Sequence, residues 1–177
     1  ISFMKIVNEL DAGPIYASFN VDIEDNDFFQ AEEKLLETSL MHINSVINEI
    51  VTNNKQPEEQ NSKEVTYAEK IDRSDGLVNW SWDTKEIKNK FLAYRKWPVL
   101  SFMFKNEKVQ IHDLEIASNQ AGTPGVIKEF TKDSLSVYCG DGIIKIKAVK
   151  FPGKKVISSI DFFNAKRDII SSGDILV

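Results

Sequence analysis

The chain has 177 residues, of which 42% are hydrophobic and 28% are charged, and its formal net charge at pH 7 is −5. A chain of this length can bury a real core in one domain or in two small ones, and its composition is that of a soluble globular protein. No window approaches the roughly 18 apolar residues that a membrane span needs, and the first residues lack the features of a secretory signal, so we expect a cytoplasmic protein. The one cysteine, Cys139, excludes an internal disulfide and argues against redox chemistry.

The charge is divided unevenly along the chain. Residues 1–80 carry 6 Lys and Arg against 16 Asp and Glu, whereas residues 81–177 carry 16 against 11. Such asymmetry favours a polyanionic partner for the basic half, although an ordinary solvated surface explains the same pattern. The composition alone leaves both interpretations open.

Two strands and one long helix are predicted at the beginning of the chain. Apolar residues alternate over residues 15–23, and residues 1–7 indicate an earlier strand that is joined to them by a turn. Over residues 28–50 the apolar spacing changes to three and four residues, which predicts a helix that covers the two strands. Asp27 and Gln30 match a capping box at its start. Because the first strand has no earlier partner and the chain starts without Met, we expect further sequence upstream.

The rest of the chain predicts a second, mostly β region. Residues 55–64 contain no large apolar side chain, which indicates an exposed linker. Asp83 and Glu86 are expected to cap a short helix, and a last helix is expected near Ser159. Between these helices, apolar stretches separated by Gly, Pro, Asn and Asp turns predict a small, mostly antiparallel barrel. Its five expected strands are residues 99–104, 109–116, 126–130, 134–139 and 143–151.

Several motifs, taken in chain order, resemble those of one family, methionyl-tRNA formyltransferase. Each motif is weak alone, but together they follow the order and spacing of the family over nearly the whole chain. They are LDAGPIY at residues 10–16, TYAEKI at 66–71, NWS at 79–81, Trp97-Pro98, PGVI at 124–127, GDG at 140–142, PGKK at 152–155 and DFFNAKR at 161–167.

The resemblance implies a fold in three parts. Residues 1–54 would be an α/β remnant, the end of a Rossmann-like formyltransferase catalytic domain, and residues 55–76 would be a linker. Residues 77–177 would form a mostly β, OB-like barrel with short helices that binds tRNA. The catalytic Asn and His of the family lie upstream of this pattern, and neither His42 nor His112 matches that histidine. The resemblance therefore implies that this chain alone is an inactive fragment.

Asp11 and Gly13 lie between the first two predicted strands, and their residue types alone fit an ordinary turn. The resemblance instead matches Asp11 to the catalytic aspartate of the family. It also implies that Asp11 and Gly13 contribute to binding of 10-formyltetrahydrofolate, the formyl donor, and that Gly13 lets the backbone pass close to the folate. Asp11 would orient the histidine that handles the proton of the attacking methionyl amine. The sequence contains no metal-ligand cluster, so no metal is expected.

Seven basic residues are candidates for contact with initiator methionyl-tRNA, because each lysine that meets a phosphate releases counterions. Lys145 and Lys147 alternate with apolar residues and are expected on one outward strand face. Most such residues are simply solvated, so the group carries more weight than any one member. The full set is Lys70, Arg95, Lys96, Lys145, Lys147, Lys154 and Lys155.

Two other functions remain open. Related enzymes formylate an amino-sugar nucleotide with a similar catalytic domain and barrel, and an OB-like barrel can also be a noncatalytic RNA-binding module. The positive barrel and the TYAEKI, PGKK and FFNAKR motifs favour the tRNA enzyme, which would act as a monomer in translation initiation. Trp80, Trp82 and Trp97 could stack on bases, but packing in the core or at a domain interface is the stronger interpretation for at least two of them.

Overall fold

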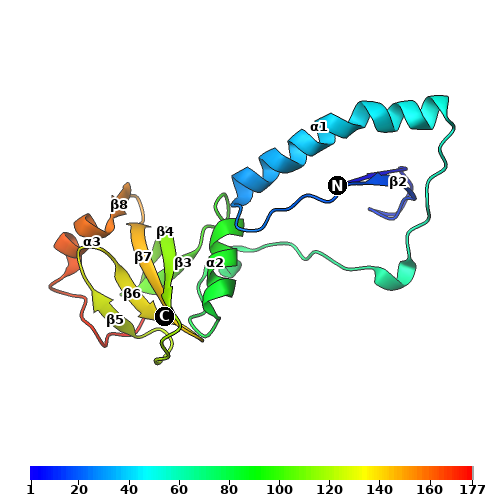
Figure 1. Cartoon of the computed structure of the whole chain (residues 1–177). Coiled ribbons are helices and arrows are strands. Elements are labelled where there is room, and N and C mark those ends of the chain that lie inside the picture. The colour runs from blue at the N-terminus through cyan, green and yellow to red at the C-terminus, as the bar shows by residue number, and fades with distance from the viewer. Residues whose placement is uncertain (177) are drawn as a thin grey trace. The chain divides into compact units, whose positions relative to one another are not determined.

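Two units, Ile1–Lys70 and Ile71–Val177, make up the chain in the computed structural model, which describes residues 1–176 (Figure 1). We call them the first unit and the second unit. The division falls inside the linker predicted over residues 55–76. Two short 3₁₀ helices, η1 (Ser62–Glu64) and η2 (Arg73–Gly76), lie on either side of it in the sequence.

The first unit begins with an antiparallel hairpin of β1 (Ser2–Met4) and β2 (Ile15–Ser18). Both strands are shorter than the apolar alternation predicts. The register shifts between Phe3 and Met4, and Ile6, which follows the strand, is 92% exposed. The alternation fails there because no described part of the unit covers these apolar side chains, so nothing stabilises a longer ladder.

Helix α1 (Phe28–Thr52) starts at the predicted capping box. The Phe29 and Gln30 amides donate to Asp27 Oδ1 at 3.0 and 3.1 Å, and the Asp27 amide donates to Gln30 Oε1 at 3.0 Å. The apolar face of the helix is nevertheless largely exposed, since Val46 is its only buried residue within the described chain. The hairpin therefore covers only a small part of this face, less than the sequence predicts.

The second unit is a six-stranded antiparallel sheet with two short helices (Figure 1). Five strands lie in the order β3-β4-β7-β6-β5, with β3 and β5 at the edges, so the sheet forms a half-barrel. The sixth, β8 (Val156–Ser158), pairs with β7 beyond the end of β6; it was not predicted because three residues are too short to show a period. The five predicted strands are confirmed as β3 (Ser101–Phe104), β4 (Glu107–Ser118), β5 (Ile127–Phe130), β6 (Leu135–Tyr138) and β7 (Ile143–Lys150).

Both helices of this unit start at side-chain caps. Asp83 accepts from the Glu86 amide at 2.6 Å at the start of α2 (Thr84–Ala93), as predicted. Ser158 Oγ accepts a weaker bond, 3.3 Å from the Asp161 amide, at the start of α3 (Ser159–Lys166). Helix α2 packs against β4, and α3 packs against β7 and β8, so the two helices contact different strands of the sheet.

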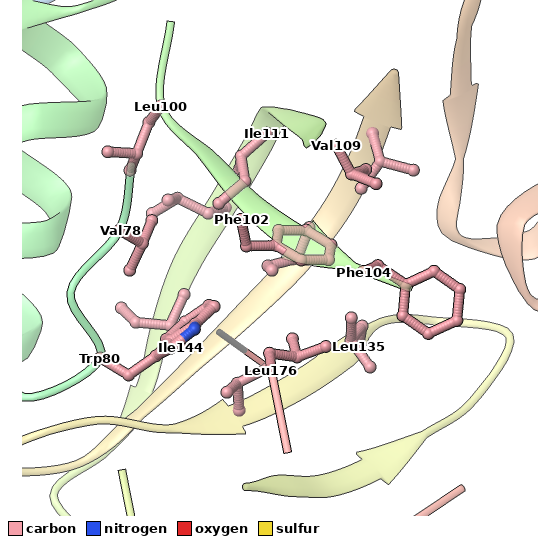
Figure 2. Close-up of a cluster of buried hydrophobic side chains, with 14 of the residues drawn as sticks. Val78, Trp80, Leu100, Phe102, Phe104, Val109, Ile111, Leu135, Ile144 and Leu176 are labelled. Atoms are coloured by element: carbon pink, nitrogen blue, oxygen red, sulfur yellow. The ribbon is translucent and has the colours of Figure 1, made fainter. Parts of the chain in front are cut away.

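One hydrophobic core lies on the inner face of the half-barrel (Figure 2). It is built by alternation along the strands and is closed by residues from loops, including Trp80, which is 5% exposed. The predicted α2 residues Ile87 and Phe91 also belong to it. The labelled core residues of Figure 2 are Val78, Trp80, Leu100, Phe102, Phe104, Val109, Ile111, Leu135, Ile144 and Leu176.

The pairing of β4 with β7 contains an irregularity that decides which side chains point outward. Ile111 pairs with Val149 and Leu114 pairs with Ile146, and all four are buried. Two residues, instead of one, therefore separate the buried positions on each strand. As a result, Lys150 is only half-buried on the outward face, where strict alternation from Ile146 would put it in the core.

We predict that Ile144→Ala lowers the free energy of unfolding of the second unit by about 2–5 kcal/mol, because Ile144 is fully buried and truncation leaves a cavity. Urea denaturation followed by tryptophan fluorescence measures this loss. The matched control is Ile116→Ala, the cross-strand partner of Ile144, which is 40% exposed and should cost less than about 1 kcal/mol. Equal losses for the two variants would contradict the position of the core.

Candidate functional site

The loop between β1 and β2 holds Asp11 in a conformation that few residue types adopt easily. Asp11 has a φ of 53°, in the left-handed region that Asp tolerates better than most residues, and its side chain is exposed. Gly13 is buried, and a Cβ built on it would lie 1.7 Å from the carbonyl oxygen of Lys5. The close approach that Gly13 permits in this structure is therefore to the backbone of its own hairpin. These contacts present the Asp11 carboxylate to solvent.

Gln60 fixes the backbone of this loop from a distant point in the sequence. Its Nε2 donates to the Asp11 carbonyl at 2.8 Å and to the Gly13 carbonyl at 2.7 Å. Close to it, Glu58 exchanges two backbone hydrogen bonds with Ile15 of β2, at 2.7 and 2.8 Å. The start of the predicted linker is thus attached to β2 by an isolated antiparallel bridge. Sequence reasoning missed Gln60, because a polar residue in a polar segment gives no periodic signal.

The basic candidates of the second unit divide into paired and exposed residues. Lys147 Nζ lies 2.5 Å from Glu115 Oε2, and this hydrogen bond, with the negative charge of Glu115 and Asp113, raises the pKa of Lys147. Lys145 lies one outward position away on the same strand, as predicted. Lys154 and Lys155 are exposed in the turn after β7. Lys147 is therefore largely neutralised by its neighbour.

Arg95 and Lys96 follow α2 and differ in their surroundings. Arg95 Nη1 donates to the His112 carbonyl at 2.8 Å, and its guanidinium lies 4.8 Å from the centre of the Phe91 ring. Arg95 thus connects α2 to β4, whereas Lys96 is exposed. Lys70, at the end of the first unit, is also exposed.

His112 lies in a positively charged part of the sheet. Partial burial, and then the charges of Lys150 and Arg95, lower the pKa of His112 below its usual value. Its Nε2 lies 3.3 Å from Gln110 Oε1. The His112 imidazole therefore lies beside Gln110 and within the field of Lys150, residues that sequence reasoning did not group together.

The three tryptophans have different environments. Trp80 is part of the core, and Lys90 Nζ lies 4.5 Å above the Trp82 ring. Trp97 is 48% exposed. Only Trp97, among these three, keeps enough free ring surface to stack on a base.

The described residues contain neither a membrane-spanning helix nor a metal-binding cluster. None of the described helices has both the length and the apolarity needed to cross a membrane. Residues 1–176 also contain no cluster of three or more His, Cys, Asp or Glu side chains suited to a metal ion.

Comparison with known sequences identifies relatives over both units. The family model "Formyl transferase, C-terminal domain" matches residues 70–167. A methionyl-tRNA formyltransferase of Sulfurihydrogenibium sp. is 34% identical over 164 residues, which cover 91% of this chain and 53% of that protein. Another, of Thermotoga maritima, is 30% identical over 167 residues, 94% of this chain and 52% of that protein. The chain spans about half the length of the curated relatives it matches.

Two solved structures are similar to this chain in fold. HypX from Aquifex aeolicus in complex with tetrahydrofolic acid has a TM-score of 0.62 at 16% identity, covering 99% of this chain and 33% of that one. Methionyl-tRNA formyltransferase from Clostridium thermocellum has a TM-score of 0.54 at 16% identity, covering 85% of this chain and 54% of that one. At this identity the likeness shows the fold alone.

We predict that Gln60→Ala loosens the Asp11 loop, because two backbone carbonyls lose the donor that holds them. Amide hydrogen exchange of residues 11–16 should accelerate by about tenfold, the effect of losing roughly 1.4 kcal/mol of local stability. Gln56→Ala is the matched control, since within residues 1–176 the Gln56 side chain donates only to Asn54, two positions before it. Unchanged exchange in Gln60→Ala would show that Gln60 does not hold the loop.

Proposed function

Because the chain belongs to the family of the formyl transferase C-terminal domain, we propose that it is the C-terminal part of an enzyme of translation initiation. This enzyme transfers a formyl group from 10-formyltetrahydrofolate to the amino group of initiator methionyl-tRNA. The observation that carries the proposal is the similarity to methionyl-tRNA formyltransferases over more than nine-tenths of the chain. The tetrahydrofolic acid bound by a structural neighbour supports the choice of formyl donor.

The chemistry gives the Asp11 carboxylate a role. When the methionyl amine attacks the formyl carbon, a tetrahedral intermediate forms with a positive nitrogen and a negative oxygen. The proton on the nitrogen must reach the folate leaving group, which requires a positioned base. We assign Asp11 to orienting and polarising that base, a histidine supplied by a part of the protein outside this chain. The exposed carboxylate and the left-handed backbone of Asp11 fit such a role.

Gly13 and helix α1 of the first unit agree with this role for Asp11. Gly13 lets the loop that carries Asp11 pack closely against the Lys5 carbonyl. We propose that the first unit is the end of a Rossmann-like catalytic domain and that the exposed apolar face of α1 packs against the remainder of that domain. The chain alone would then hold the formyl donor poorly and transfer no formyl group.

The second unit is assigned to tRNA binding. Its half-barrel is compatible with an OB-like domain, and its basic residues provide the positive charge that a phosphate backbone requires. We propose that Lys154 and Lys155, which are exposed, and Lys145, which is half-buried, contribute most, because none of them takes part in the ion pair between Lys147 and Glu115. Lys70, Arg95 and Lys96 are further candidates, with Arg95 also holding α2 to β4.

In the whole protein, Asp11→Asn should lower the turnover number for formylation of methionyl-tRNA by two orders of magnitude or more, because the amide no longer carries the charge that polarises the histidine. The affinity for tRNA should stay within about twofold of the parent. Single-turnover formylation and a binding titration measure the two quantities. Asp22→Asn, an exposed carboxylate after β2, is the control and should retain full turnover. Full activity of Asp11→Asn would remove Asp11 from the catalytic set.

For RNA binding, Lys154→Glu together with Lys155→Glu should weaken the affinity of the chain for initiator tRNA and reduce the salt slope by about one to two. The reason is that two exposed cations are replaced by anions. The matched charge control is Lys128→Glu together with Lys132→Glu; Lys128 lies on β5 and Lys132 follows it. Fluorescence anisotropy at several salt concentrations measures both pairs. An unaltered slope in the first pair would exclude the turn after β7 from the interface.

A further inference from the structure

A hollow of about 250 Å³ opens where β7 ends, beside the beginning of β4. None of the residues that line it is among the seven basic candidates for tRNA contact. Strand β4, the end of β7 and the turn that follows it supply its walls. The lining residues are Lys108, Gln110, Lys150, Phe151, Pro152 and Gly153.

The irregular pairing of β4 and β7 brings the polar walls together. Gln110 and Lys150 are cross-strand partners, and Lys108 lies one outward position from Gln110 along β4. Regular alternation from Ile146 would turn Lys150 inward, so the extra residue on each strand is what places its ammonium group in this hollow. Gly153, with a φ of 68°, turns the chain sharply, and a Cβ built on it would contact nothing. The turn therefore leaves the mouth of the hollow open.

Lys108 and Lys150 give the lining of the hollow a net positive charge. None of the described residues that line it is acidic. Farther along the same sheet face, by contrast, Lys147 is neutralised by Glu115 at 2.5 Å. The lowered pKa of His112, to which Lys150 contributes after burial, reports the same positive field from a neighbouring position.

Hydrogen-bond donors remain available at this point. Lys108 Nζ donates to the Arg73 carbonyl at 3.2 Å, which holds the side chain in place and occupies one of its three donors. Gln110 turns its amide oxygen toward His112, so its NH₂ group supplies two more donors. Two ammonium groups and one amide around a small hollow match an anion with several acceptor oxygens.

We propose that this hollow binds one phosphate group, held between Lys108 and Lys150 and oriented by Gln110, and that the phosphate is a phosphodiester of bound RNA. The assignment of RNA as the source rests on the proposed function and extends it to a defined point of contact. Pro152 and the edge of Phe151 provide an apolar wall on which a ribose can lie. A free phosphorylated small molecule would use the same chemistry, so the test separates the two sources.

The experiment compares the parent chain with Lys108→Gln, Lys150→Gln, the double variant and the control Lys128→Gln. Lys128 lies on β5, three strands from β4 in the sheet order, and its removal subtracts the same charge. Initiator tRNA is titrated at several salt concentrations, and inorganic phosphate is titrated separately while the Gln110 and Gly153 amides are followed by NMR. Thermal unfolding of each variant verifies that it is folded.

Each single variant should weaken tRNA binding by about fivefold to tenfold and reduce the salt slope by about one, and the double variant should reduce it by about two. Lys128→Gln should leave the slope within error of the parent. Phosphate should shift the Gln110 and Gly153 amides of the parent and of Lys128→Gln but not those of the double variant. Phosphate shifts with unchanged tRNA affinity would support the anion site but overturn RNA as its source. Absence of specific phosphate shifts in the parent would overturn the site itself, whatever the tRNA affinity.

Discussion

The second unit depends on one constraint, the pairing of β4 with β7 around an extra residue on each strand. On the inner side this pairing keeps Ile111, Leu114 and Val149 in one core. On the outer side it gathers lysines that a regular ladder would distribute differently. Because a shift of one residue turns every later side chain to the other face of a sheet, the core and the charged face are set by the same register. A change at the irregularity would therefore disturb folding and binding together.

In the first unit, the contacts that hold the Asp11 loop all reach its backbone. The Lys5 carbonyl lies close to Gly13, and Gln60 Nε2 donates hydrogen bonds to the Asp11 and Gly13 carbonyls. The Asp11 carboxylate makes none of these contacts, so the loop fixes the position of Asp11 without occupying its carboxylate. Such an arrangement is useful for a group that must act on a partner residue, because the geometry is fixed before the partner arrives.

The sequence predicts the regular parts of this fold well. Capping residues such as Asp27 and Asp83 and the period-two strands are local signals, and the structure confirms them. The short strand β8 has too few residues to show a period. The apolar spacing does lengthen from two to three between Ile111 and Leu114 and between Ile146 and Val149, but the spacing within one strand does not say which residues of the other strand it pairs with, so the register of β4 with β7 was not predicted. The apolar face of α1 shows a related limit: the helical period is correct, but the described residues leave most of that face exposed.

The candidate site was predictable only in part, for similar reasons. Asp11 was selected by resemblance to a family, since an aspartate and a glycine between two strands are equally typical of a plain turn. Gln60 and Lys108 escaped notice because their roles arise from hydrogen bonds to the Asp11 and Arg73 carbonyls, which only the folded backbone brings within reach. For Lys147, the outward direction of the side chain was predicted, but its pairing with Glu115 was not.

The central claim is that the protein containing this chain formylates an aminoacyl-tRNA. The most direct measurement is a competition in which the whole protein receives 10-formyltetrahydrofolate with equal concentrations of methionyl initiator tRNA and an amino-sugar nucleotide, and mass spectrometry quantifies both products. The account predicts formyl-methionyl-tRNA as the dominant product. Formylation of the sugar nucleotide alone, or of neither acceptor, would contradict it.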